Sequence, residues 1–457
     1  MNKPTHKRYV LIVLLFFHTV NTYMDRICIS AASDSIKSDL GINDQMMGYI
    51  FGIFAFGYAL FQIPSGWIAD QYGPKKALSW VVIAWSSFTA LTGAAWNAAS
   101  MLVLRFLFGV GEAGAFPGAT RAFYNWIPAN ERGPANGIFH SGARAGAAMS
   151  LFVMPLLINY VGWRLTFVIN GLIGLVWVAF WIVWFRDYPR QKKEVNHLEL
   201  AYIEKGIPGT NVSERKIPLA GILTSFNMFM VMFQYMASNI TFFISFTWLL
   251  PYLVSQWGRG AEIYAPIPLL LGMFAQWTSG WLMRVIYERG YPVLSRKLPA
   301  IAGFSIAVVG LLLITSMAVS SPLTFVLFFS VAVFGVEMTI APSWSLCMDI
   351  GGDKSGTVSA TMNMVGNIGS AFSAIIFPFF VSYVTIPFLV TSTGNANSFF
   401  VFAAMMNLLA IGAWLYISPN RRIIVANARQ IRRRLIIFFT IIFLIAAGAL
   451  LYKFLNP

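Results

Sequence analysis

The sequence predicts an all-α integral membrane protein. Hydrophobic residues make up 58% of the 457 residues and charged residues only 11%, whereas a soluble globular protein carries about 25% charged residues. The mean hydropathy is +0.68. The apolar stretches are long and unbroken, which favours helices over the alternating strands of a membrane β-barrel. Since a transmembrane helix needs about 20 mainly apolar residues, the chain has room for about twelve or thirteen. These observations exclude a water-soluble enzyme, a disordered protein and a fibrous protein.

Twelve apolar stretches fit membrane-spanning helices. They cover residues 9–31, 46–70, 77–96, 101–125, 133–158, 163–186, 225–255, 262–287, 298–319, 322–348, 353–383 and 397–418. A further stretch, 435–454, is apolar on all sides, so we expect it to cross the membrane as a thirteenth helix rather than lie on its surface.

The longest polar stretch separates two sets of six spans. The sequence therefore predicts an N-terminal six-helix half (1–186), a cytoplasmic central loop (187–224), a C-terminal six-helix half (225–420) and a basic linker with the extra helix (421–457). Two six-helix halves around a midplane site are typical of transporters built from two repeats.

Positively charged residues gather before the first span, between spans 6 and 7, and after span 12, while the loops between carry few. Lysine and arginine are enriched in cytoplasmic loops. The distribution therefore predicts a multi-pass protein with a cytoplasmic N-terminus. The lack of long external domains and of an obvious organelle signal favours the bacterial inner membrane. Although the net charge is +15, we expect the basic clusters to contact lipid headgroups rather than nucleic acid.

No cofactor or metal is expected. The four histidines and two cysteines show no ligand spacing. Residues 109–114 match G-x-G-x-x-G, but they lie inside an apolar helix, where small residues indicate close helix packing rather than nucleotide binding.

Ionisable residues inside the spans are the main functional candidates, because a charge at the bilayer centre costs about 2.5–3.5 kcal/mol. The candidates are Asp25, Arg26, Arg105, Glu112, Arg144 and Glu337. One interpretation is structural, with Asp25–Arg26 and Arg105–Glu112 as ion pairs that tie helices together. The other is functional, because a buried arginine binds anions bidentately and a neighbouring carboxylate can exchange protons. That combination is the chemistry of proton–anion symport.

The loop between spans 2 and 3, residues 66–76, resembles the signature loop of the major facilitator superfamily, G-x-x-x-D-[RK]-x-G-[RP]-[RK], with Gln71 in place of the usual basic residue. The resemblance implies that Asp70 contacts a helix terminus or a neighbouring arginine and latches one gating state. The residues of this gating loop are Gly66, Asp70, Gly73, Lys75 and Lys76. The corresponding stretch of the second half, residues 280–290, lacks the aspartate, so the resemblance does not extend to a latch there.

Further strings resemble the anion:cation symporter family, which includes bacterial hexuronate, galactonate and glucarate permeases and animal sialin. In the first half they are residues 21–26, 58–67, 105–118 and 131–133, and in the second half Trp344 with Asp349 and residues 363–367. The resemblance covers about residues 10–420 and implies the major facilitator fold.

The resemblance also implies roles for individual residues. Asp25 and Glu112 would couple protons, Arg26 would bind the substrate carboxylate, and Arg105 would organise Glu112 or the anion. The further substrate contacts would be Tyr23, Tyr58, Asn363 and Asn367, with Trp344 as a wall of the cavity. Packing or helix-to-helix hydrogen bonding is the alternative for these aromatic and amide side chains.

The chain departs from the sugar-acid permeases at three positions. Ala143 stands where those permeases have a glutamine, Arg144 offers a second anion contact, and Glu337 replaces a small residue. Glu337 is either a further proton site or the partner of an arginine.

We therefore expect a monomeric secondary transporter that imports a small organic anion with protons by rocking of its two halves. A sugar acid is the first expectation, and a larger polycarboxylate such as a citrate-type siderophore, or an aromatic acid, is the alternative. The buried arginines disfavour an exporter of lipophilic cationic drugs. A membrane enzyme would need a nucleophile–base pair or a metal site, and none is visible.

Overall fold

The computed structural model describes residues 3–207, 219–316, 319, 321–383, 396–420 and 423. Every element of regular secondary structure in these ranges is helical, as predicted. The helices of the first part are α1 (Lys7–Ala31), α2 (Ser33–Leu40), α3 (Asp44–Tyr72), α4 (Pro74–Thr92), α5 (Ala98–Glu112), α6 (Ala115–Trp126), α7 (Arg132–Trp184) and α8 (His197–Gly206). Those of the second part are α9 (Leu219–Thr224), α10 (Phe226–Thr247), α11 (Leu249–Trp257), α12 (Ile267–Glu288), α13 (Pro292–Ser316), α14 (Pro322–Met338), α15 (Ile340–Gly351), α16 (Ser355–Tyr383) and α17 (Ala396–Tyr416).

The described helices make twelve passes of membrane-spanning length. Eight stretches are long and apolar enough to cross a membrane, and two of them contain two passes each. The 53-residue α7 would be about 80 Å long if straight, but Gly162 divides it with a φ of 79°. The stretch from Pro322 to Val381 turns at Gly352, whose φ is 53°. Helices α4 and α12 supply the remaining two passes. The predicted thirteenth helix, 435–454, lies outside the described residues.

Polar side chains fix where several helices begin. Each accepts a hydrogen bond from a backbone N–H of the first helical turn, which would otherwise lack a partner. These caps are Asn43 for α3, Asn97 for α5, Asn196 for α8, Ser225 for α10 and Ser321 for α14.

The fourth and tenth passes are each broken into two helices. In the fourth pass α5 ends at Glu112 and α6 begins at Ala115, and in the tenth α14 ends at Met338 and α15 begins at Ile340. Broken helices at membrane depth are tolerated where the break is buried in protein or lines a polar site. Both breaks place a glutamate, Glu112 or Glu337, at the end of the first helical piece.

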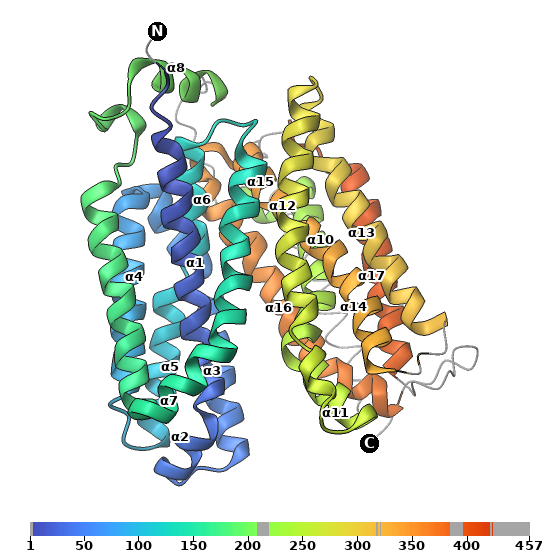
Figure 1. Ribbon diagram of the computed structural model, residues 1–457. Helices are drawn as coiled ribbons and strands as arrows, with labels where there is room; N and C mark the ends of the chain where they lie inside the picture. Colours follow the sequence, from blue (N-terminus) through green and yellow to red (C-terminus); the bar gives the residue numbers. More distant parts are fainter. Residues whose placement is uncertain are drawn as a thin grey trace.

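Helices α1 to α7 lie on one side of the molecule and α10 to α17 on the other (Figure 1). The two groups meet closely at the end that carries the N-terminus and α8, here called the α8 end, and lie farther apart at the end of α2 and α11. Glycines permit the close approach: a Cβ on Gly66 of α3 would lie 2.6 Å from Ala360 Cβ of α16, and one on Gly137 of α7 would lie 2.5 Å from the carbonyl oxygen of Gln276 in α12.

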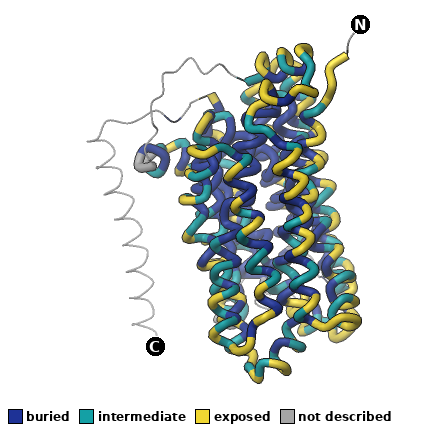
Figure 2. Tube along the Cα trace, turned by 90° about the vertical axis from the view of Figure 1, so that its left-hand side faces the viewer, coloured by how far each residue is buried: buried dark blue, intermediate teal, exposed yellow. Residues whose placement is uncertain are grey.

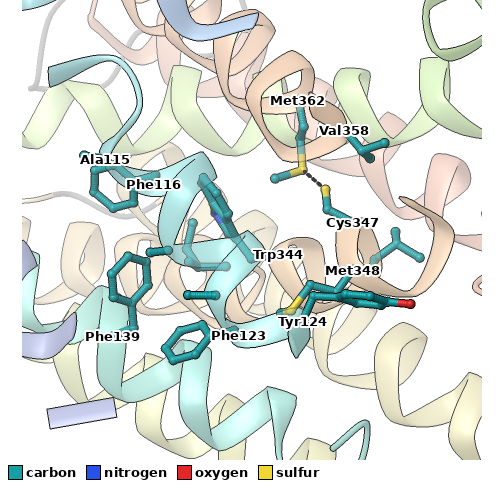
Figure 3. Packing of buried hydrophobic residues seen from close by; sticks show 14 of the residues in the cluster. Ala115, Phe116, Phe123, Tyr124, Phe139, Trp344, Cys347, Met348, Val358 and Met362 are labelled. Atoms are coloured by element: carbon teal, nitrogen blue, oxygen red, sulfur yellow. Dashed lines mark hydrogen bonds between the residues drawn. The ribbon is translucent and has the colours of Figure 1, made fainter. Parts of the chain in front are cut away.

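Aromatic and aliphatic side chains fill the contact between α6, α7, α15 and α16. Trp344 lies beside Phe116, with ring centres 5.7 Å apart, and Cys347 Sγ lies 3.5 Å from Met362 Sδ (Figure 3). Buried residues follow the inner sides of the helices and exposed ones the outer sides (Figure 2). Large apolar side chains such as Phe152 and Val183, which are 69% and 76% exposed, belong to that outer surface. An apolar perimeter is what contact with lipid requires.

Candidate functional site

An arginine–glutamate pair joins α1 to α5. Arg26 Nε donates to Glu112 Oε1 at 2.7 Å. The guanidinium carbon of Arg26 lies 5.1 Å from the ring centre of Tyr23, 5.3 Å from Phe54 and 4.6 Å from Tyr58. The side chain of Arg26 is 18% exposed, whereas that of Glu112 is fully buried. Arg26 is therefore the member of the pair that an anion from solution can reach.

Asp25 and Arg105 lie near this pair, and both are buried. Neither carboxylate oxygen of Asp25 has a hydrogen-bond partner among the described residues, and Arg105 Nε and Nη1 lack one as well. The structural interpretation of the sequence is wrong in its pairing: Glu112 takes its ion pair from Arg26 of another helix, not from Arg105 of its own. Buried polar atoms without a hydrogen bond are costly, so both residues stay functional candidates.

A second arginine–glutamate pair joins α7 to α14. Arg144 Nη2 lies 2.5 Å from Glu337 Oε1, and Arg144 Nε donates to Oε2 at 3.2 Å, so the pair is bidentate. Gln276 Nε2 of α12 also donates to Glu337. The guanidinium carbon of Arg144 lies 3.9 Å from the ring centre of Phe242. Of the two sequence interpretations of Glu337, the structure places it as the partner of an arginine.

Tyr23 lies close to the arginines of both pairs. The guanidinium carbon of Arg26 is 5.1 Å from its ring centre and that of Arg144 is 5.9 Å away. These distances to one ring put the two guanidinium groups within about 11 Å of each other. The positive charges predicted from separate spans therefore belong to one site.

Asn363 and Asn367, which were predicted to contact the substrate, lie on α16 and donate hydrogen bonds to other protein groups. Asn363 Nδ2 donates to Tyr58 Oη at 3.2 Å, and Asn367 Nδ2 donates to the carbonyl oxygen of Asn363 at 2.8 Å. Trp344 is 1% exposed, and its Nε1 donates to Tyr235 Oη at 3.1 Å. The bond from Asn363 brings α16 to the Tyr58 that flanks Arg26.

Asp70 of the gating loop receives the N-terminus of α16. Its Oδ1 accepts from the backbone N–H of Gly356 at 2.9 Å, and its Oδ2 accepts from the N–H and the hydroxyl of Thr357 at 2.7 and 2.6 Å. Arg121 Nε lies 3.6 Å from the same carboxylate. A carboxylate at a helix N-terminus is favourable because unpaired N–H groups and the helix dipole converge there. Both partners predicted for Asp70, a helix terminus and an arginine, are present.

The rest of the gating loop turns the chain into α4. Gly73 has a φ of 85°, and a Cβ there would lie 2.8 Å from the carboxylate of Asp187. That carboxylate accepts from the N–H of Lys75 at 2.8 Å, and Lys76 is exposed. Burial raises the pKa of Asp187, against the hydrogen bond and positive charge of Lys75.

A second set of ion pairs at the α8 end was not predicted. Asp349 of α15 accepts from Arg132 Nη1 of α7 at 2.6 Å and from Arg296 Nε of α13 at 2.8 Å. Arg296 also donates to the carbonyl oxygen of Ala129 at 2.8 Å. Although the second half lacks an equivalent of Asp70, the two helix groups are thus joined through Asp349 as well.

Sequence reasoning also missed Gln276 and Tyr235. Gln276 donates a hydrogen bond to Glu337, and Tyr235 accepts one from Trp344. A signal existed, because a glutamine inside an apolar span is a polar group that must find a partner. The ring centre of His140 lies 4.7 Å from that of Trp344, a contact that the sequence does not reveal.

Comparisons with known proteins agree with this fold. The family model described as the Major Facilitator Superfamily matches residues 14–374. The chain is 31% identical over 427 residues to the probable sulfoacetate transporter SauU of Cupriavidus necator, covering 92% of this chain and 96% of that protein. It is 30% identical over 454 residues to the probable galactarate/D-glucarate transporter GudP of Bacillus subtilis, covering 94% and 96%.

The hexuronate transporter of Bacillus subtilis is 28% identical over 417 residues, covering 88% of this chain and 92% of that protein. Among solved structures, the proton:xylose symporter XylE bound to 6-bromo-6-deoxy-D-glucose superposes with a TM-score of 0.65 at 15% identity, covering 90% of this chain and 96% of that chain. At this identity the likeness concerns the fold.

Proposed function

The chain belongs to the major facilitator superfamily, as a multi-pass membrane transporter and not an enzyme, and we propose that it imports an organic anion together with protons. A sugar acid is the first candidate, because relatives that the chain matches over most of its length are named as galactarate/D-glucarate and hexuronate transporters. A larger polycarboxylate or an aromatic acid is the alternative substrate.

The observation that carries the proposal is the pair of Arg26 with Glu112. Arg26 is partly exposed and lies against aromatic rings, whereas Glu112, which pairs with it, is fully buried. A substrate carboxylate that binds Arg26 competes with Glu112 for the same guanidinium. Once Glu112 loses its ion pair, an unpaired buried carboxylate is costly, so it takes up a proton. Anion binding and proton binding are thereby coupled at one arginine.

Asp25 completes the proposed proton site. It is buried beside Glu112 and Arg105, with which it interacts electrostatically. Since like charges disfavour ionisation of both acids, a proton that leaves one is readily accepted by the other. Release of the proton restores the Arg26–Glu112 pair and displaces the substrate.

We further propose that residues 1–186 and 225–420 rock against each other about this site, with 187–224 as the connecting loop. The ion pairs and helix cap at Asp70 and Asp349 close the α8 end in this conformation. The distribution of lysine and arginine supports a cytoplasmic N-terminus and α8 end. The conformation described here would then face outward, in the inner membrane of a bacterium.

Uptake into proteoliposomes tests the proposal. Purified protein receives an inward proton gradient and labelled galactarate, galactonate, galacturonate, an aromatic acid or a ferric citrate-type siderophore. We expect gradient-driven uptake of one class, its loss in Arg26→Gln, and substrate exchange without uphill uptake in Glu112→Gln. Arg164→Gln is the matched control, because Arg164 is 41% exposed and pairs with Asp39 away from the site. Normal uptake by Arg26→Gln would refute the proposed role of the pair.

A further inference from the structure

We propose that the transported anion carries two negatively charged groups, one bound by Arg26 and the other by Arg144, where it takes the place of the Glu337 carboxylate. This inference rests on the proposed function and specifies its substrate class. The inference concerns Arg144 and Glu337, two positions at which this chain differs from the sugar-acid permeases.

The two arginine–glutamate pairs are built alike. Each glutamate lies at the end of the first helical piece of a broken pass, Glu112 in the fourth and Glu337 in the tenth. In each pair the arginine lies on a different helix from the glutamate, and its guanidinium group lies against an aromatic ring. Each acid is at most 1% exposed. If Glu112 gives up Arg26 to a substrate carboxylate, the same chemistry is available to Glu337 and Arg144.

The two guanidinium groups are close enough for one dianion to contact both. Because both guanidinium carbons lie within about 6 Å of the ring centre of Tyr23, they are at most about 11 Å apart. A six-carbon diacid extends about 6 Å between its carboxyl carbons, and a charge-assisted hydrogen bond adds about 3 Å at each end. A diacid of this length therefore reaches both arginines, whereas a monoacid of equal length leaves an uncharged hydroxyl at Arg144.

A purely structural role explains the second pair less well. Replacing a buried ion pair by apolar side chains is often neutral or stabilising, so cross-linking of helices does not by itself call for one. Glu337 also keeps a second donor in Gln276. When a substrate group displaces its carboxylate from Arg144, Glu337 is not left without any partner.

Equilibrium binding of two probes that differ at one end tests the inference. Galactarate has a carboxylate at both ends of a six-carbon chain, and galactonate has one. We expect the wild type to bind galactarate about tenfold or more tightly than galactonate, the range for one hydrogen-bonded charge pair. In Arg144→Gln the two affinities should come within about twofold of each other, and Arg144→Lys, which keeps the charge without the bidentate geometry, should retain part of the preference.

The variant Glu337→Gln separates substrate binding from helix cross-linking. It leaves Arg144 without its internal carboxylate, so galactarate binding should tighten about fivefold or more while galactonate binding stays unchanged. A structural pair predicts the same direction of change in Arg144→Gln and Glu337→Gln, and that result would overturn the inference. Arg164→Gln is the control: it removes an ion pair, with Asp39, that lies away from the site, and the ratio of the two affinities should stay at its wild-type value.

Uptake measurements distinguish a failure of the dianion inference from a failure of the proposed function. Proton-driven uptake of galactonate with no preference for galactarate would overturn the dianion inference and leave the proposed function standing. Failure of the wild type to take up any anion under a proton gradient would overturn the proposed function itself.

Discussion

Replacing Asp70 by asparagine should open the α8 end of the molecule. The aspartate carboxylate accepts three hydrogen bonds from Gly356 and Thr357 and lies 3.6 Å from Arg121. Asparagine keeps the shape but removes the charge and turns an NH₂ group toward donors. Hydrogen bonds to charged groups contribute about 1.5–3 kcal/mol each, so losing one of them disfavours closure by about 1.5–3 kcal/mol. The ratio of closed to open molecules then falls about 10- to 150-fold.

Distance measurement between two spin labels at the α8 end is a direct assay. Lys193→Cys, just before α8, and Arg289→Cys, at the end of α12, provide exposed attachment points on the two helix groups. The native Cys28 and Cys347 are both buried and should not be labelled. Because alternating conformations differ by a few kcal/mol, Asp70→Asn should produce a longer distance in a large fraction of molecules.

The control is Asp34→Asn at the opposite end of the molecule. The side chain of Asp34 is 92% exposed and pairs only with the neighbouring Lys37 among the described residues, so the substitution removes a carboxylate without touching the contact between the helix groups. The distance distribution should stay as in the wild type. An unchanged distribution in Asp70→Asn would refute the conclusion that this carboxylate holds the α8 end closed.

Three further predictions follow from the same contacts. Gly66→Leu places a side chain where a Cβ already lies 2.6 Å from the neighbouring helix, so uptake should fall at least about tenfold while size-exclusion behaviour stays normal. Glu199 accepts hydrogen bonds at the start of α1, including one from the N–H of Arg8; burial alone would raise the pKa of Glu199, but these bonds hold it below its ordinary value. The contribution of Glu199 to stability is therefore complete above its unfolded pKa of about 4.3 and is lost as the pH falls through the lower pKa of the folded state. Glu199→Gln should cost about 2–3 kcal/mol at pH 7, and the thermal unfolding of variant and wild type should converge as the pH falls below that lowered pKa. Asp25→Asn should abolish uphill uptake while exchange persists, because it removes one of the two proposed proton acceptors, as transport assays with and without a proton gradient would show.

The twelve passes could be predicted because the lipid interior demands them. A helix satisfies its own backbone groups, and only apolar stretches of sufficient length are stable in hydrocarbon. Even the division of α7 was visible, since the predicted spans 133–158 and 163–186 stop on either side of Gly162. The ends of the helices agree to within a few residues for the same reason.

The partners of the charged residues could not be predicted from spacing. Helical periodicity reveals only which residues share a face of one helix, and it brought Arg105 together with Glu112. The structure pairs Arg26 with Glu112 across 86 positions of sequence, and Arg144 with Glu337 across 193. These choices depend on which helices pack side by side, and this information is not local.

The anchor of the N-terminus was missed for a similar reason. Arg8 is one of the positively charged residues before the first span, which the sequence relates only to orientation and to lipid headgroups. In the structure its Nε donates to Glu131 at 2.7 Å and its Nη1 to Glu199 at 3.1 Å. Both acids lie in loops or short helices far along the chain. A positive charge near a membrane surface signals orientation, and the same charge can also hold two polar segments together.

The two ion pairs between α7 and the tenth pass suggest how substrate binding reaches the α8 end. Arg132 and Arg144 of α7 pair with Asp349 and Glu337, so that pairs 12 residues apart, about 18 Å along a helix, join the same two passes. A dianion that displaces Glu337 from Arg144 removes the inner pair and leaves the outer one to hold these passes together. Because a ligand shifts a conformational equilibrium only through its different affinity for the two states, galactarate should then favour opening of the α8 end more than galactonate does. In the spin-labelled protein we expect galactarate to lengthen the distance between the labels, and the same addition to have no effect in Arg144→Gln. Equal lengthening in both proteins would show that the inner pair does not transmit substrate binding.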